Sequence, residues 1–128
     1  MNPCTPIQSA PGARRQLAEK AYAAIEAGCR EKFSLDKLAD SLYVNKCYLV
    51  RAFSATFGYS PLVCHNRCRC HQACRLLARR DLSVTEIGYQ VGFVSNAHFS
   101  RIFRDIVGVT PTDYRKELMD GQFQTNVS

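Results

Sequence analysis

Residues 84–111 read VTEIGYQVGFVSNAHFSRIFRDIVGVTP, and much of the same pattern occurs earlier, at residues 35–61, in LDKLADSLYVNKCYLVRAFSATFGYSP. The clearest matches lie fifty positions apart and are Arg51 with Arg101, Phe53 with Phe103, Gly58 with Gly108 and Pro61 with Pro111. Toward the start of the stretch the offset is forty-nine, so the second copy holds one extra residue, around positions 92–94. A repeat of this length indicates that one structural unit is used twice.

Each copy is predicted to form two short helices joined by a tight turn, because its apolar residues recur every three or four positions. These residues are Leu35, Leu38, Ala39, Leu42, Leu49, Ala52, Phe53 and Phe57 in the first copy, and Val84, Ile87, Val91, Phe99, Ile102, Phe103 and Ile106 in the second. Residues that cap or end helices flank them: Ser34, Asn45 and Gly58, then Ser83 with Glu86, Ser95 and Gly108. This arrangement is typical of a helix-turn-helix unit. An ordinary helical bundle, the alternative, has no need of an arginine kept on the exposed side of both second helices.

Three further helices complete the prediction. A leading helix is expected from about Arg14 to Cys29, and its apolar face comprises Leu17, Ala21, Ala24 and Ile25. Each copy ends in Ser60-Pro61 or Thr110-Pro111, a capping residue and a proline that suits the first position of a new helix. We therefore expect an all-α, homeodomain-like fold of seven helices. Its segments are a flexible N-terminal part (1–13), a first helix-turn-helix subdomain (14–60), a long linker helix (61–80), a second subdomain (81–118) and a flexible tail (119–128).

The composition fits a small globular protein with an acidic partner. The chain has 128 residues, 46% of them hydrophobic, and its 17 Lys and Arg against 11 Asp and Glu give a net charge of +6. Such a balance suits a polyanion. No apolar run approaches the roughly 20 residues of a membrane span, and the N-terminus lacks the apolar stretch of a signal peptide. We therefore expect a cytoplasmic protein without a membrane partner.

The most specific motif of the chain lies in residues 82–116. Its marks are Ile87, Gly92-Phe93, Phe99-Ser100-Arg101, Phe103, Gly108, Thr110-Pro111 and Tyr114-Arg115, and the likeness extends back to about Phe33. These residues resemble the DNA-binding domain of the AraC/XylS family of bacterial transcription regulators. The resemblance implies a nucleoid-associated regulator, expected to be an activator and not an enzyme, with double-stranded DNA and RNA polymerase as partners. Most members carry a further ligand-binding or dimerisation domain, so the chain is either a stand-alone regulator or the C-terminal domain of a longer one.

The length of the linker helix suits a bipartite DNA site. The nineteen residues from Pro61 to Arg79 would span about 28 Å as an α-helix. Successive major grooves on one face of a duplex are about 34 Å apart. We therefore expect the isolated domain to act as a monomer that places two recognition helices in adjacent major grooves.

The second helix of each copy is expected to contact DNA bases. The positions that match the base-reading residues of the family are Lys46, Cys47, Val50, Arg51, Asn96, Ala97, His98, Ser100 and Arg101. Arg51 and Arg101 are the strongest candidates, because an arginine can donate two hydrogen bonds to guanine, worth about 1–3 kcal/mol of discrimination. For His98, an exposed polar role without base contact is an equal alternative. DNA phosphates are expected at the helix N-termini capped by Ser34 and Ser83, and at Arg104.

The predicted linker helix contains a cysteine-rich stretch, CHNRCRCHQAC, at residues 64–74, which holds four of the seven cysteines. Cys64, Cys68 and His71 share one stripe of the helix, with ligand types that suit zinc or copper. One straight helix cannot surround an ion, so a fourth ligand would have to come from elsewhere, such as Cys47 or a second molecule.

Ordinary packing is the simpler interpretation of the cysteines, because buried cysteine behaves as a small hydrophobic residue. We therefore expect no cofactor. The alternative function is a metal- or thiol-responsive regulator that senses through this helix. A thiol enzyme is not favoured, since no Cys/His pair is tied to an orienting acid.

Overall fold

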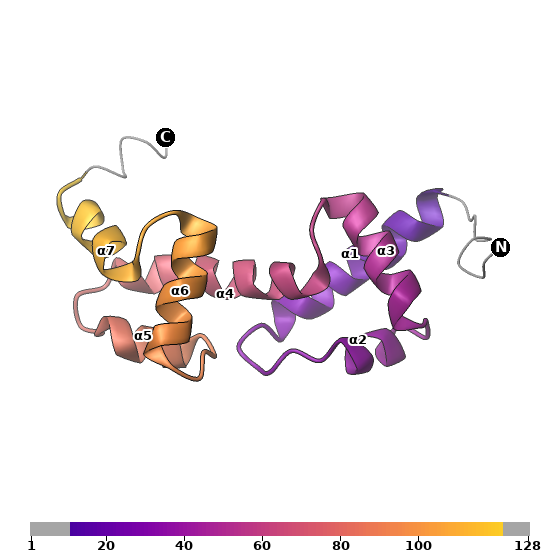
Figure 1. Ribbon diagram of the computed structural model, residues 1–128, viewed down its shortest axis with the longest axis horizontal. Coiled ribbons are helices and arrows are strands. Elements are labelled where there is room, and N and C mark those ends of the chain that lie inside the picture. The colour runs from indigo at the N-terminus through magenta and orange to yellow at the C-terminus, as the bar shows by residue number, and fades with distance from the viewer. Residues whose placement is uncertain (1–10, 122–128) are drawn as a thin grey trace. The chain divides into compact units, whose positions relative to one another are not determined.

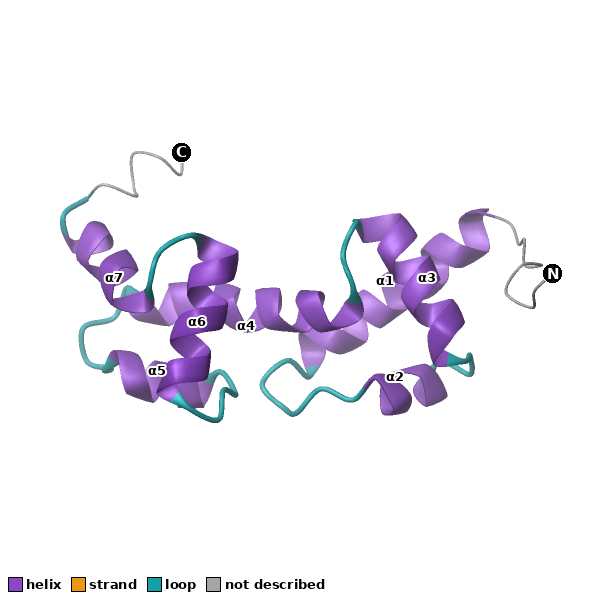
Figure 2. Ribbon diagram, viewed as in Figure 1, coloured by secondary structure: helices purple, strands orange, loops and turns teal. Residues whose placement is uncertain are grey.

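The structure is a computed structural model that describes residues 11–121, and these residues form seven helices without a strand (Figures 1 and 2). The helices are α1 Pro11–Ala27, α2 Leu35–Ser41, α3 Lys46–Phe57, α4 Pro61–Leu77, α5 Val84–Gln90, α6 Asn96–Val107 and α7 Pro111–Met119. The expected all-α class and number of helices are therefore confirmed. The helix α1 begins three residues before the expected Arg14, and α7 ends at Met119, the first residue of the predicted tail. Residues 1–10 and 122–128 of the two ends predicted to be flexible lie outside the described residues.

The chain divides into two compact units, Met1–His65 and Asn66–Ser128. The boundary falls inside α4, the helix that corresponds to the predicted linker helix. Its first turn supplies the buried Cys64 to the first unit, and its later turns supply Cys70, Ala73 and Leu77 to the core of the second.

The helices begin and end where the sequence places capping groups. Side chains of the predicted cap residues accept hydrogen bonds from backbone N–H groups three positions later: Ser34 from Lys37, Asn45 from Tyr48, Ser83 from Glu86, Ser95 from His98 and Thr110 from Asp113. The second helix of each copy ends at a glycine in the left-handed conformation, which Gly58 adopts at φ 84° and Gly108 at φ 102°. Local sequence signals therefore set the boundaries of α3 and α6, the second helices of the two copies.

The extra residue of the second copy lies in the turn, as predicted. Residues 42–45 join α2 to α3, whereas residues 91–95 join α5 to α6. Gly92 takes a left-handed conformation there, at φ 107°, and the equivalent residue of the first copy is Tyr43, at φ 60°. The two turns therefore have left-handed backbone at equivalent positions with different residues, and this conformation strains the tyrosine.

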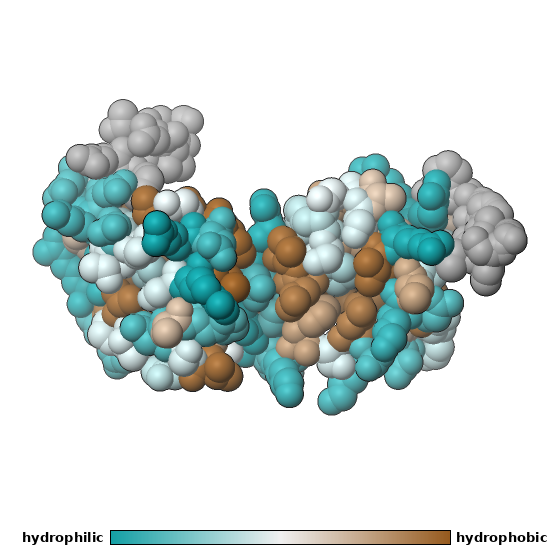
Figure 3. All heavy atoms as spheres, viewed as in Figure 1, coloured by the Kyte–Doolittle hydropathy of each residue, from teal (hydrophilic) through white to brown (hydrophobic). Residues whose placement is uncertain are grey.

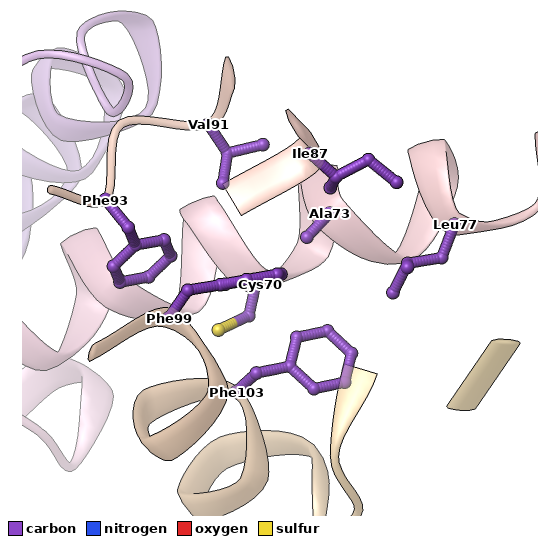
Figure 4. Close-up of a cluster of buried hydrophobic side chains, with 8 residues drawn as sticks. All are labelled: Cys70, Ala73, Leu77, Ile87, Val91, Phe93, Phe99 and Phe103. Atoms are coloured by element: carbon purple, nitrogen blue, oxygen red, sulfur yellow. The ribbon is translucent and has the colours of Figure 1, made fainter. Parts of the chain in front are cut away.

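The core of the second unit is formed by α4, α5, α6 and the turn before α6 (Figure 4). Its buried residues are Cys70, Ala73, Leu77, Ile87, Val91, Phe93, Phe99 and Phe103. The rings of Phe99 and Phe103 meet edge to face with centroids 5.7 Å apart, and Phe93 packs on Phe99 at 5.2 Å. These contacts fix the rotation of α6 about its axis, so its opposite face is turned to solvent.

In the first unit, α1 packs against α3. The buried residues are Ala18, Ala21, Ile25, Cys29, Ala39, Leu49, Ala52, Phe53 and Cys64. One expectation for α1 is wrong, because Ala24 is exposed and Ala18 is buried instead. The reason is geometric: Ala18, Ala21 and Ile25 form a single stripe with a spacing of three to four residues, and Ala24 lies beside that stripe.

Candidate nucleic-acid interface

The helices α3 and α6 each bury one face and expose the other. In α3 the exposed face carries Lys46, Cys47 and Arg51, and the buried residues are Leu49, Ala52 and Phe53. In α6 the exposed face carries Asn96, Ala97, Arg101 and Arg104, and the buried residues are Phe99 and Phe103. Strongly hydrophilic side chains gather over α6 on the face seen in Figure 3. Most of the candidate base-reading residues thus lie on surfaces that a nucleic acid can reach.

Three of the candidate residues are only partly accessible. Val50, His98 and Ser100 are half-buried. The imidazole of His98 meets the ring of the buried Phe93 edge to face, with centroids 5.4 Å apart. Part of the His98 side chain therefore supports the turn before α6, which a sequence pattern alone did not reveal.

Arg51 and Arg101 occupy equivalent exposed positions in the two units. Among the described residues, neither guanidinium forms a salt bridge or a side-chain hydrogen bond. Each follows a buried residue of its helix, Leu49 or Phe99, by two positions, which places it on the opposite side. Both arginines can therefore offer their donors to a ligand without breaking an internal contact.

Lys46 is engaged within the first unit. Its Nζ lies 2.9 Å from Oδ1 of Asp36 on α2, and both side chains are exposed. The hydrogen bond that Lys46 donates to the Asp36 carboxylate, and then the charge of that carboxylate, raise the pKa of Lys46 above its ordinary value. Any contact of Lys46 with DNA therefore competes with this ion pair.

The candidate phosphate positions differ from one another. The hydroxyls of Ser34 and Ser83 already accept hydrogen bonds as helix caps. The N–H of Ser83 donates to Oε1 of Glu86 at 2.8 Å, and this bond, followed by the hydroxyl contact with Ser83, lowers the pKa of Glu86. The Glu86 carboxylate, an anionic group, thus already lies at the N-terminal end of α5. Arg104 is exposed in the last turn of α6.

Residues 38–117 match the protein family described as a helix-turn-helix domain. The HTH-type transcriptional regulator GbdR of Pseudomonas aeruginosa is 31% identical over 117 residues, which are 91% of this chain and 32% of GbdR. A transcriptional regulator from Chromobacterium violaceum with an AraC-type DNA-binding domain matches at a TM-score of 0.75 and 28% identity, over 83% of this chain and 95% of that structure.

The chain belongs to the AraC family of helix-turn-helix transcription regulators. The DNA-binding domain of AdpA, solved in complex with a target DNA, matches at a TM-score of 0.74 and 29% identity, over 84% of this chain and 96% of that structure. The chain spans about a third of the length of the curated relatives it matches. The similarity thus covers the DNA-binding part of these regulators.

The cysteines of this AraC-family chain are divided between core and surface. Cys64 and Cys70 are buried, Cys68 is half-buried and His71 is exposed. Burial raises the pKa of Cys70 to about 12, so it stays a thiol at neutral pH. Within residues 11–121 no group of three or more His, Cys, Asp or Glu side chains is placed to hold a metal ion. The structure therefore does not bring the predicted ligands Cys64, Cys68 and His71 together as a site.

Three basic side chains that are buried or half-buried were not identified from the sequence. His65 is 3% exposed, its Nε2 lies 3.0 Å from the backbone oxygen of Glu31, and its ring packs on Phe33. Arg69 is 7% exposed, with its guanidinium carbon 5.2 Å from the centroid of the Phe93 ring. The sequence did contain a signal for this burial. His65, Arg69 and the buried Ala73 are four residues apart each time, a spacing that places them on one buried side of the helix.

Arg115 is the third of these residues. Its Nε donates to the backbone oxygen of Leu77 at 3.1 Å, and its Nη2 donates to that of Arg79 at 2.8 Å. Carbonyl groups at the C-terminal end of a helix lack partners within the helix, so α7 supplies a cap for α4 through this side chain. A basic residue of the family motif therefore has a structural role within the second unit.

None of the helices within residues 11–121 has the combination of length and apolar content that crossing a lipid bilayer requires.

Proposed function

We propose that this chain is the domain through which an AraC-family regulator reads an extended, asymmetric DNA site, with α3 and α6 as its two recognition helices. The observation that carries the proposal is the equivalence of Arg51 and Arg101. Both are exposed arginines on the second helix of a repeated unit, opposite buried residues that hold the helix in place. A pair of helices with free arginine donors suits two separate contacts with guanine in the major groove.

Two further parts of the proposal rest on family membership and on the sequence. The isolated domain binds adjacent major grooves as a monomer, as the length of the linker helix predicts. The complete regulator activates transcription together with RNA polymerase at the bacterial nucleoid. The DNA-binding domain of AdpA was solved in complex with a target DNA, which supports DNA as the ligand of this chain. The monomeric state and the use of two adjacent grooves rest on the length of the linker helix.

The test combines site selection with three arginine variants. The purified chain is used to select DNA sites from a random library, and footprints are then compared for wild type, Arg51→Ala, Arg101→Ala and Arg14→Ala. Arg51→Ala and Arg101→Ala should each weaken binding by about 1–3 kcal/mol and relax base preference in separate patches about one helical turn apart. Both should keep the wild-type helix content, because both side chains are exposed.

Arg14 provides the matched control, since it is an exposed arginine on α1 whose removal changes the net charge equally. Its replacement should leave the base preferences intact. The proposal is wrong if Arg51→Ala and Arg101→Ala alter the same base pairs, or if both weaken binding to every sequence equally.

A further inference from the structure

The ion pair between Lys46 and Asp36 lies at the start of the first recognition helix. Lys46 is the first residue of α3, and Asp36 is the second residue of α2. The ammonium nitrogen and a carboxylate oxygen are 2.9 Å apart, and both side chains are more than half exposed. The carboxylate is therefore set beside a residue expected to contact DNA.

The second unit offers an internal comparison, because the repeat aligns each residue of one unit with one of the other. At an offset of forty-nine, Asp36 corresponds to Thr85, and at an offset of fifty, Lys46 corresponds to Asn96. Neither of these residues is charged. The nearby carboxylate of Glu86 accepts a hydrogen bond from the backbone N–H of Ser83, and the Ser83 hydroxyl accepts one from the backbone N–H of Glu86. The ion pair at the recognition helix is thus a property of the first unit.

The pair opposes contacts with phosphate. A lysine at the first position of a twelve-residue helix, next to its positive N-terminal end, would by itself favour a phosphate. The Asp36 carboxylate already holds that ammonium and repels a second anion at the same place. A guanine base edge is an uncharged acceptor, so it does not suffer the same repulsion. Asp36 therefore penalises sequence-independent binding more than binding to a correct base.

We propose that Asp36 is a specificity-determining residue of the first unit, which lowers binding to non-cognate DNA by keeping Lys46 away from backbone phosphates. The inference rests on the proposed function of α3 as a recognition helix. Its consequence is large in a cell, because a regulator must find its site among a vast excess of competing sequences. The affinity ratio between operator and random DNA then matters more than either affinity alone.

The experiment measures the binding of Asp36→Asn to a random-sequence duplex and to the selected operator over a series of salt concentrations. Binding to random DNA should tighten by about 1.4- to fivefold, the range of an exposed charge pair. The log–log dependence on salt should steepen by about 0.9, the value for one additional phosphate contact. Operator binding should change less, so the operator-to-random ratio should fall.

Three variants isolate the role of the pair. Asp36→Glu keeps the charge and should behave as wild type. Lys46→Met in the Asp36→Asn background should cancel the gain in random-DNA affinity. Asp40→Asn, which removes the same charge from an exposed position of the same helix, should leave the salt slope unchanged. Helix content by circular dichroism should be equal in all of them.

The inference is overturned if Asp36→Asn leaves the salt slope unchanged, or if Asp40→Asn has the same effect. Failure of the proposed function has different signatures, namely that the wild-type chain selects no DNA site at all, or that Arg51→Ala and Arg101→Ala alter the same base pairs or weaken binding to every sequence equally. If the wild type selects an operator and the Asp36 and Asp40 variants behave alike, only the role of Asp36 is wrong.

Discussion

Gly88 is buried where α5 packs against α6, and the space around it has no room for a side chain. A Cβ added there would lie 2.6 Å from Cδ2 and 2.9 Å from Cγ of Phe99. Both atoms belong to the ring of a side chain with no exposed surface, so the ring cannot move aside easily. In the first unit the residue equivalent to Gly88 is the larger Ala39, and the residue equivalent to Phe99 is the smaller Leu49.

We expect Gly88→Ala to lower the free energy of unfolding by about 1–3 kcal/mol, because overpacking outweighs the better helix propensity of alanine. Urea unfolding followed by circular dichroism measures the change. Adding Phe99→Leu, which recreates the pair found in the first unit, should reduce the cost of the alanine. If Gly88→Ala lowered the free energy of unfolding equally with phenylalanine and with leucine at position 99, the steric explanation would be incorrect.

At the scale of elements, α7 is tied to the end of α4 through Arg115. Its two hydrogen bonds reach backbone oxygens 38 and 36 residues earlier in the chain. Both acceptors lie at the point where α4 ends and the connection to α5 begins. The side chain therefore helps to determine where α4 stops, which the sequence placed at about Arg80.

Replacing Arg115 should destabilise the second unit without changing base preference. Arg115→Ala should lower the free energy of unfolding by about 1.5–3 kcal/mol, the range for hydrogen bonds that involve a charged group. Arg115→Lys should recover little of it, because an ammonium lacks the planar fork of donors. The exposed neighbour Lys116 serves as the control, and Lys116→Ala should stay within about 0.5 kcal/mol of wild type. Equal effects at the two positions in urea unfolding would argue against a capping role.

At the scale of the whole molecule, both units have apolar cores made by their own helices. Folding should therefore not require a metal ion, unlike that of zinc fingers. Circular dichroism spectra recorded with and without a strong chelator should coincide, and elemental analysis should find less than one equivalent of zinc or copper. Loss of helical signal on chelation would instead support the metal-responsive alternative.

The net charge of +6 leads to a second prediction at this scale. Binding to random DNA should be weak and should fall steeply with salt, because each neutralised phosphate releases counterions and contributes about −0.9 to the log–log slope. Fluorescence anisotropy over a several-fold range of salt measures the slope. Affinity that stays constant over this range would mean that DNA phosphates are not the partner.

Local signals in the sequence were enough to determine the elements and the candidate interface. The caps at Ser34, Asn45 and Ser95, and the glycines that end α3 and α6, act over three or four residues, so a linear pattern contains them fully. The repeat then placed Arg51 and Arg101 on equivalent exposed faces, as found. Fold class, helix order and the positions of the two proposed recognition helices all follow from such short-range rules.

Only the tertiary structure decided which polar groups are covered and which charges are paired. His65 reaches a backbone oxygen 34 residues earlier, and Arg115 reaches one 38 residues earlier. Asp36 and Lys46 come from different helices, α2 and α3, and their charged groups meet at 2.9 Å. The physical reason is that burial and ion pairing depend on which distant segments pack together, whereas capping and periodicity depend on near neighbours in the chain.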